Sequence, residues 1–91
     1  MSETAARPLR QSRVVFTRAG ETALLLDPTN GGYFSLSDVG ARIWELCDGK
    51  HTLDDIADTL AAEYDAPSEA IRADASELLE ELGAEGLLER L

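Results

Sequence analysis

The sequence predicts an α+β fold in which a three-stranded antiparallel sheet is followed by three helices, an arrangement like a winged helix-turn-helix. Three short apolar runs come first, at residues 13–18, 22–27 and 32–36, and they contain β-branched or aromatic side chains. From Ser37 onward the apolar residues recur at helical spacing instead. A chain of 91 residues with 44% hydrophobic side chains can form one small domain with its own core.

Turn-forming residues separate the three apolar runs. The first break is Ala19-Gly20-Glu21, and the second is the segment from Asp27 to Gly31, which contains Pro28 and Asn30. Pro28 presets its own φ, while Asn30 and Gly31 tolerate the positive φ of a tight reversal. Both breaks therefore predict hairpins, and the three strands form a meander.

Capping residues mark the start of each predicted helix. Ser37 can cap a first helix that stops at Asp48-Gly49, and Thr52 can cap a second with Asp55 as its capping-box partner. Pro67 suits the first turn of a third helix. The inward-facing residues of this third helix are Ile71, Ala75, Leu78, Leu79 and Leu82, and we expect Leu87, Leu88 and Leu91 to fold back onto the core.

Residues 1–12 show neither helical nor strand periodicity, so they predict a flexible basic arm ahead of a domain that spans residues 13–91. The net charge is −10, and because residues 1–18 hold four Arg and one Glu, the rest of the chain carries −13. This charge opposes binding to nucleic acid or to an anionic membrane. With no long apolar segment in the sequence, we expect a cytoplasmic protein.

The sequence offers little for catalysis or metal binding. Cys47 and His51 are the only residues of their types, which excludes an internal disulfide and a Cys/His metal cluster. Cys47 lies on the apolar stripe of the first helix and His51 in a turn, where an exposed structural histidine is the common case. The glycines match no phosphate-binding loop. None of these residues therefore forms a recognisable catalytic, metal-binding or phosphate-binding signature.

The third predicted strand, Gly32 to Leu36, has no charge and no proline, although it lies at an edge of the meander. Edge strands are usually protected by such residues or by a covering segment. Two interpretations follow: the edge accepts another extended chain, or the arm or the C-terminal tail covers it.

The segment from Asp27 to Glu89 resembles the PqqD-like family of leader-peptide recognition elements. The matching stretches are D-P-T-N-G-G-Y-F-S-L-S-D-V-G-A-R-I-W-E-L-C-D-G, T-L-D-D-I-A-D-T-L, I-R-A-D-A-S-E-L-L-E-E-L and G-L-L-E. The resemblance implies a winged-helix-like module that binds the leader of a precursor peptide as a strand added to its third strand, beside its third helix. Carried over by position, the peptide-binding residues are Gly32, Tyr33, Phe34, Ser35, Leu36, Ile71, Asp74, Ala75 and Leu78.

Given this resemblance, which implies a module without catalytic activity, the leading hypothesis is an adaptor without a cofactor, not an enzyme, that delivers a ribosomally made precursor peptide to a maturation enzyme. That enzyme would be a leader protease in a lasso-peptide pathway or a radical S-adenosylmethionine enzyme in a pyrroloquinoline quinone pathway, and the motifs do not distinguish them. We expect a monomer or a weak dimer. A winged-helix DNA-binding regulator and a structural dimerisation module that pairs its third strand with a second copy are the alternatives.

Overall fold

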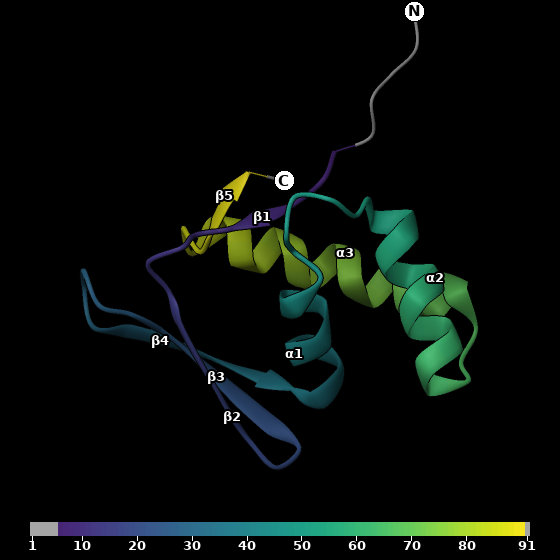
Figure 1. Cartoon of the computed structure of the whole chain (residues 1–91), viewed down its shortest axis with the longest axis horizontal. Helices are drawn as coiled ribbons and strands as arrows, with labels where there is room; N and C mark the ends of the chain where they lie inside the picture. The colour runs from purple at the N-terminus through teal and green to yellow at the C-terminus, as the bar shows by residue number, and fades with distance from the viewer. Residues whose placement is uncertain (1–5, 91) are drawn as a thin grey trace, which may run out of the picture.

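The structure is a computed structural model that describes residues 6–90. This part of the chain forms a three-stranded sheet, three helices and a separate pair of short strands (Figure 1). The sheet is antiparallel in the order β2 (Val15–Ala19), β3 (Thr22–Asp27), β4 (Gly32–Ser37). The helices are α1 (Asp38–Glu45), α2 (Leu53–Tyr64) and α3 (Ser68–Ala84). The predicted α+β class, a meander followed by three helices, is confirmed.

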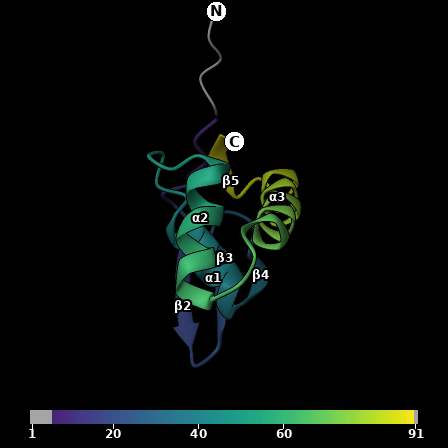
Figure 2. The same cartoon turned by 90° about the vertical axis from the view of Figure 1, so that its right-hand side faces the viewer.

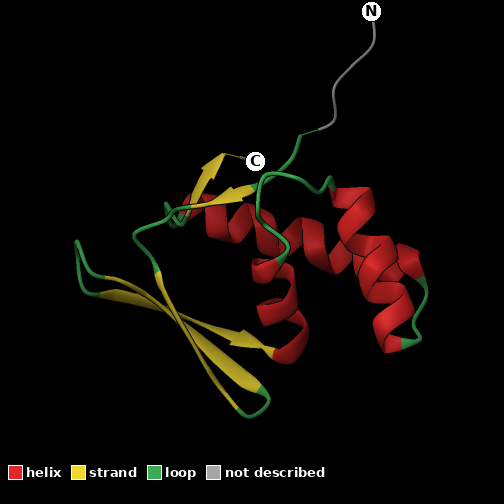
Figure 3. Ribbon diagram, viewed as in Figure 1, coloured by secondary structure: helices red, strands yellow, loops and turns green. Residues whose placement is uncertain are grey.

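The sheet buries one face and exposes the other. Along β3, Ala23, Leu25 and Asp27 are buried, while the residues between them are exposed. This alternation places the apolar side chains of β3 toward α1, which packs on β3 and β4. Figure 3 shows the sheet on one side of the molecule and the helices on the other, with α1 between the sheet and α2.

The caps expected from the sequence are formed. The Ser37 hydroxyl accepts a hydrogen bond from the Gly40 N–H at 3.1 Å. Thr52 and Asp55 form a reciprocal capping box at the start of α2, with bonds of 3.0 and 3.1 Å. Pro67, expected in the first turn of α3, instead precedes its first residue and occupies the N-cap position without a side-chain capping bond. The two helices α2 and α3 pack against each other and stand next to each other in Figure 2.

Within residues 1–12, the segment predicted as a flexible arm, Leu9–Arg10 forms strand β1. It pairs antiparallel with β5 (Leu88–Arg90), and the Arg10 N–H donates to the Cys47 carbonyl at 2.9 Å. The Arg10 guanidinium donates to the Glu45 carbonyl at 3.0 Å, which satisfies the carboxyl end of α1. Residues 1–5 of the predicted arm lie outside the described part of the chain.

The same pairing corrects the predicted end of the first helix. The helix ends at Glu45, three residues before the expected stop at Asp48, because Asp48 forms a β-bridge with Leu9. Leu87 and Leu88 are buried, as expected from the sequence, whereas Leu91 lies outside the described residues. Within residues 6–90, no helix is both long enough and apolar enough to cross a membrane.

Asp27 is the buried charged residue of the described chain, with 3% of its surface exposed. Arg13 donates two hydrogen bonds to its carboxylate, at 3.1 and 2.9 Å, and also one to the Gly86 carbonyl at 3.1 Å. The Thr29 N–H and hydroxyl donate to the same carboxylate. The hydrogen bond from Arg13, followed by those from Thr29, holds the pKa of Asp27 well below its usual value.

Asp27→Asn is expected to lower the melting temperature at neutral pH, and the loss should shrink as the pH falls. The pKa of Asp27 is lower in the folded protein than in the unfolded chain, where it is about 3.8, so the ionised carboxylate stabilises the fold at pH values above 3.8. This contribution disappears as the pH falls toward the pKa of the folded state. Thermal melts of both proteins between neutral pH and about pH 3 measure the effect. Asp58→Asn, on an exposed position of α2, is the control, and a difference for Asp27 that stays constant across this range would contradict the prediction.

Candidate functional site

The free edge of β4 is the first component of the candidate site. In the described part of the chain β4 pairs with β3 on one side and with no strand on the other. The segments that could have covered it pair with each other instead, as β1 and β5. Of the two interpretations drawn from the sequence, the one in which the arm or tail covers this edge is not realised within residues 6–90.

The hairpin geometry determines which backbone groups of β4 face the open side. The Gly31 N–H donates to the Asp27 carbonyl at 2.8 Å, so the backbone of Asp27 faces β4 and its register partner Gly32 faces β3. Backbone direction alternates along an antiparallel strand. Tyr33 and Ser35 therefore turn their N–H and C=O groups toward the open edge.

The turn at the other end of β3 gives the same assignment independently. A two-residue turn joins Ala19 to Thr22, which are register partners. In a hairpin with a turn of this length, the backbone N–H and C=O groups of the two closing residues face each other. Thr22 thus faces β2, and by alternation Ala23, Leu25 and Asp27 face β4. The register pairs these three with Leu36, Phe34 and Gly32, whose backbone groups consequently face β3.

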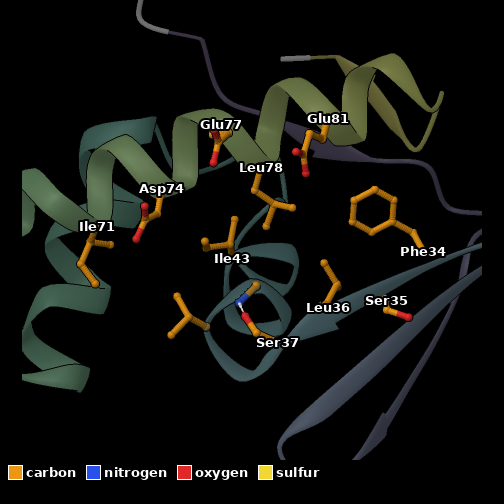
Figure 4. A pocket seen from close by; sticks show the side chains of 12 residues that line it. Phe34, Ser35, Leu36, Ser37, Ile43, Ile71, Asp74, Glu77, Leu78 and Glu81 are labelled. Atoms are coloured by element: carbon orange, nitrogen blue, oxygen red, sulfur yellow. Dashed lines mark hydrogen bonds between the residues drawn. The ribbon is translucent and has the colours of Figure 1, made fainter.

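A groove of about 540 Å³ runs beside this edge, between β4, α1 and α3. Figure 4 shows Phe34 near one end and Ile71 near the other, with Leu78 and Ile43 between them. Phe34 and Leu78 are partly buried and pack against the core, while Leu36 and Ile43 are buried. The described residues that line the groove are Phe34, Ser35, Leu36, Ser37, Val39, Gly40, Ile43, Ile71, Asp74, Glu77, Leu78 and Glu81.

The floor and the rim of the groove differ in chemistry. Apolar side chains from three elements form the floor, whereas Asp74, Glu77 and Glu81 of α3 contribute carboxylates. These three positions are exposed and follow one another at helical spacing, so they lie along one side of α3. An open strand edge beside an apolar groove can hold an extended polypeptide, with hydrogen bonds from the edge and side-chain contacts from the floor.

Six of the nine residues expected from the sequence line the groove, and the other three are placed differently. Ala75 is fully buried and lies outside the groove lining, because it continues the stripe of α3 that faces the core. Gly32 lies at the end of β4, and its N–H donates to the Asn30 side chain at 2.8 Å. Tyr33 points to the outer face of the sheet, where it is 74% exposed, so its contribution to the edge is its backbone.

Sequence reasoning missed half of the lining. Val39 and Ile43 of α1 line the groove, as do Glu77 and Glu81 of α3, and none of the four is among the peptide-binding residues expected from the sequence. A helical projection through Asp74 and Leu78 would have found Glu77 and Glu81, because residues three and four apart share a face. Ser37 and Gly40 carried no comparable signal, since their place depends on how α1 meets the sheet.

Cys47 and His51, the other candidates weighed for chemistry, lie apart from the groove lining. Cys47 is fully buried and its Sγ lies 3.2 Å from the Ile43 carbonyl. Burial raises the pKa of this thiol to about 12. The His51 ring, expected to be exposed, is half-buried, with Nδ1 2.9 Å from the Asp48 carboxylate.

Cys47 is therefore expected to react very slowly with a water-soluble disulfide reagent while the protein is folded. The thiolate is the reactive form of cysteine, and the raised pKa keeps its fraction small at neutral pH. Burial of the side chain also keeps the reagent away from the sulfur. Absorbance of the released thiol in native buffer, compared with guanidinium-denatured protein as control, measures the rate. Rapid stoichiometric reaction of native protein would contradict the burial.

Comparison with known protein families identifies the fold's relatives. A family model described as coenzyme PQQ synthesis protein D (PqqD) matches residues 22–88. The chain belongs to the PqqD family. The matched segment contains β3, β4 and all three helices, and thus every residue that lines the groove. The resemblance inferred from the sequence is confirmed.

Curated relatives of this PqqD-family chain are named PqqA binding proteins. The protein from Bradyrhizobium diazoefficiens is 30% identical over 86 residues, which cover 92% of this chain and 82% of the relative. The protein from Methylococcus capsulatus is 38% identical over 68 residues, covering 75% of this chain and 69% of the relative.

Two solved structures share the fold of this PqqD-family chain, each with a TM-score of 0.77. TbiB1 in complex with the TbiA(beta) leader peptide is 31% identical and matches 89% of this chain and 94% of its own. A lasso peptide synthetase B1 complexed with its leader peptide is 24% identical, with coverage of 91% and 98%, and shows the likeness of fold alone.

Proposed function

We propose that this protein binds the leader segment of a ribosomally made precursor peptide as an additional strand on β4, beside α3. The observation that carries the proposal is the open edge of β4 next to an apolar groove. Similar proteins support it, since relatives are named as binding PqqA and TbiB1 has been solved with a leader peptide.

Each part of the site has a separate role in this function. The N–H and C=O groups of Tyr33 and Ser35 hold the leader in register but distinguish poorly between sequences, because every peptide has the same backbone. The floor, with Phe34, Leu36 and Leu78, accepts apolar side chains and so selects the leader.

The protein then acts as an adaptor that presents the leader to a maturation enzyme and contributes no catalytic residue. The enzyme is a leader protease if the pathway makes a lasso peptide, or a radical S-adenosylmethionine enzyme if it makes pyrroloquinoline quinone. Relatives are named PqqA binding proteins, and TbiB1 has been solved with a leader peptide, so the similar proteins do not decide between the two kinds of enzyme.

The charge of α3 argues against the DNA-binding alternative. This helix holds five acidic residues and one basic residue, Arg72, whereas a helix that reads a DNA groove needs cationic side chains. Arg72 also donates to Asp54 of α2 at 2.5 Å, so its charge is already paired.

Titration of fluorescently labelled leaders into the protein tests the proposal. The probes are the TbiA(beta) leader, PqqA and the precursor encoded nearest to this chain's gene. We expect saturable binding of at least one, together with slowed amide exchange at Tyr33 and Ser35 measured by nuclear magnetic resonance. Binding of none, or binding without protection of these two amides, would overturn it, and a mass that doubles without peptide would favour the dimerisation module.

A further inference from the structure

We infer that the groove selects cationic peptides: the bound segment carries an apolar residue flanked, two residues away on each side, by Lys or Arg. This inference rests on the proposed function and adds to it the chemistry of the guest. It follows from the carboxylates of α3, the apolar floor beneath them and the spacing of side chains along an extended chain.

The carboxylates are placed around an apolar contact point. Asp74 and Glu77 precede Leu78 on α3 and Glu81 follows it one turn later, and all four residues line the groove (Figure 4). The described lining residues include no Lys, Arg or His. A guest peptide in the groove therefore meets negative charge on both sides of Leu78.

The basic side chains of α1 and α3 form ion pairs with other carboxylates. Arg72 of α3 bonds Asp54, and Arg42 of α1 donates to both oxygens of Glu63 on α2, at 2.9 and 2.8 Å. These contacts point the two cations toward α2. Carboxylates alone would make only a solvated helix face, but here they border a groove and an open strand edge that already fit a peptide.

The spacing of the guest follows from backbone geometry. Asp74 and Glu81 are separated by roughly 10 Å along the helix axis, at about 1.5 Å per residue. In an extended chain, side chains on one face recur every two residues, so positions i−2 and i+2 lie roughly 13 Å apart. These two separations are similar, and the long, flexible side chains of Lys and Arg at i−2 and i+2 can reach the carboxylates of Asp74 and Glu81. The apolar residue between them then packs over Leu78 and Ile43.

Selection from a display library of random twelve-residue peptides tests the inference. Peptides that bind the wild-type protein are retained, and those that also bind Ser35→Pro are discarded, which leaves peptides that need the open edge. We expect the retained pool to be enriched in an apolar residue with Lys or Arg at i−2 and i+2.

Two triple variants with the same change in net charge then locate the effect. Asp74→Asn, Glu77→Gln, Glu81→Gln removes the groove carboxylates, and Asp58→Asn, Glu80→Gln, Glu89→Gln removes three exposed carboxylates that do not line the groove. Selected peptides should bind the first variant about tenfold more weakly, because each exposed ion pair contributes a fraction of a kcal/mol. Binding to the second should change by less than about twofold.

The possible results separate this inference from the proposed function. A pool that is apolar but neutral or acidic, or equal losses in both triple variants, would overturn the charge selection and leave strand addition intact. If no peptide is retained after the Ser35→Pro step, both the inference and the proposed strand addition fail.

Discussion

Replacing Ser35 by Pro is expected to weaken leader binding about a hundredfold while leaving the protein folded. The Ser35 N–H faces the open edge of β4, so its loss removes no hydrogen bond to β3. Proline is tolerated at edge positions whose N–H points away from the sheet. In the complex, however, the variant removes one hydrogen bond and leaves a carbonyl of the guest unpaired, which together cost about 3 kcal/mol.

Ser35→Ala is the matched control, because it removes the hydroxyl and keeps the backbone N–H. Its affinity for the leader should stay within about threefold of wild type. Fluorescence anisotropy gives both affinities, and circular dichroism melts establish that each variant is folded. Unchanged binding by a folded Ser35→Pro variant would rule out strand addition at β4.

Phe34→Pro makes a useful comparison, since the same substitution one residue earlier acts on the other side of the strand. The Phe34 N–H faces β3, so this change breaks the protein's own sheet and should lower the melting temperature. The sequence alone could not assign Phe34 and Ser35 to opposite sides. That assignment depends on the register of the hairpin, which the Gly31 to Asp27 hydrogen bond fixes.

Local signals in the sequence were sufficient for most of the fold. Ser37 and the pair Thr52 and Asp55 satisfy backbone groups within three residues of themselves, so their roles are determined by nearby sequence. The strands likewise follow from short apolar runs between turn residues. Such interactions are predictable because they need no knowledge of distant segments.

Strand β1 could not be predicted for the opposite reason. Leu9 and Arg10 make their contacts with residues 88–90, with Cys47 and with Asp48, all distant along the chain. Two residues are too few to show a strand period. The pairing explains both the strand at Leu9–Arg10 and the early end of α1.

The candidate site was predicted in part, and the differences follow from where α3 rests. Helical spacing marked Ile71, Ala75 and Leu78 as apolar, but spacing alone does not say which of them faces the core and which faces the groove. In the folded protein Ala75 is completely buried in the core, whereas Leu78 is only partly buried.

Leu78 and Leu79 therefore provide a test in which truncation of two adjacent leucines should affect different properties, leader binding for Leu78 and stability for Leu79. Leu79 is 5% exposed in the core and does not line the groove. Leu79→Ala should destabilise the protein by about 3 kcal/mol, the usual loss for a buried leucine. For a domain of this size that lowers the melting temperature by about 15 °C.

Leu78→Ala should instead act on binding. Its side chain is only partly buried and lines the groove, so truncation costs roughly 1 kcal/mol of stability but removes an apolar contact at the centre of the site. We expect the leader affinity of this variant to fall about tenfold or more. At a temperature where both variants are folded, Leu79→Ala should bind nearly as well as wild type. If Leu79→Ala lost affinity as strongly as Leu78→Ala, the groove between β4 and α3 would not be the site where the leader is selected.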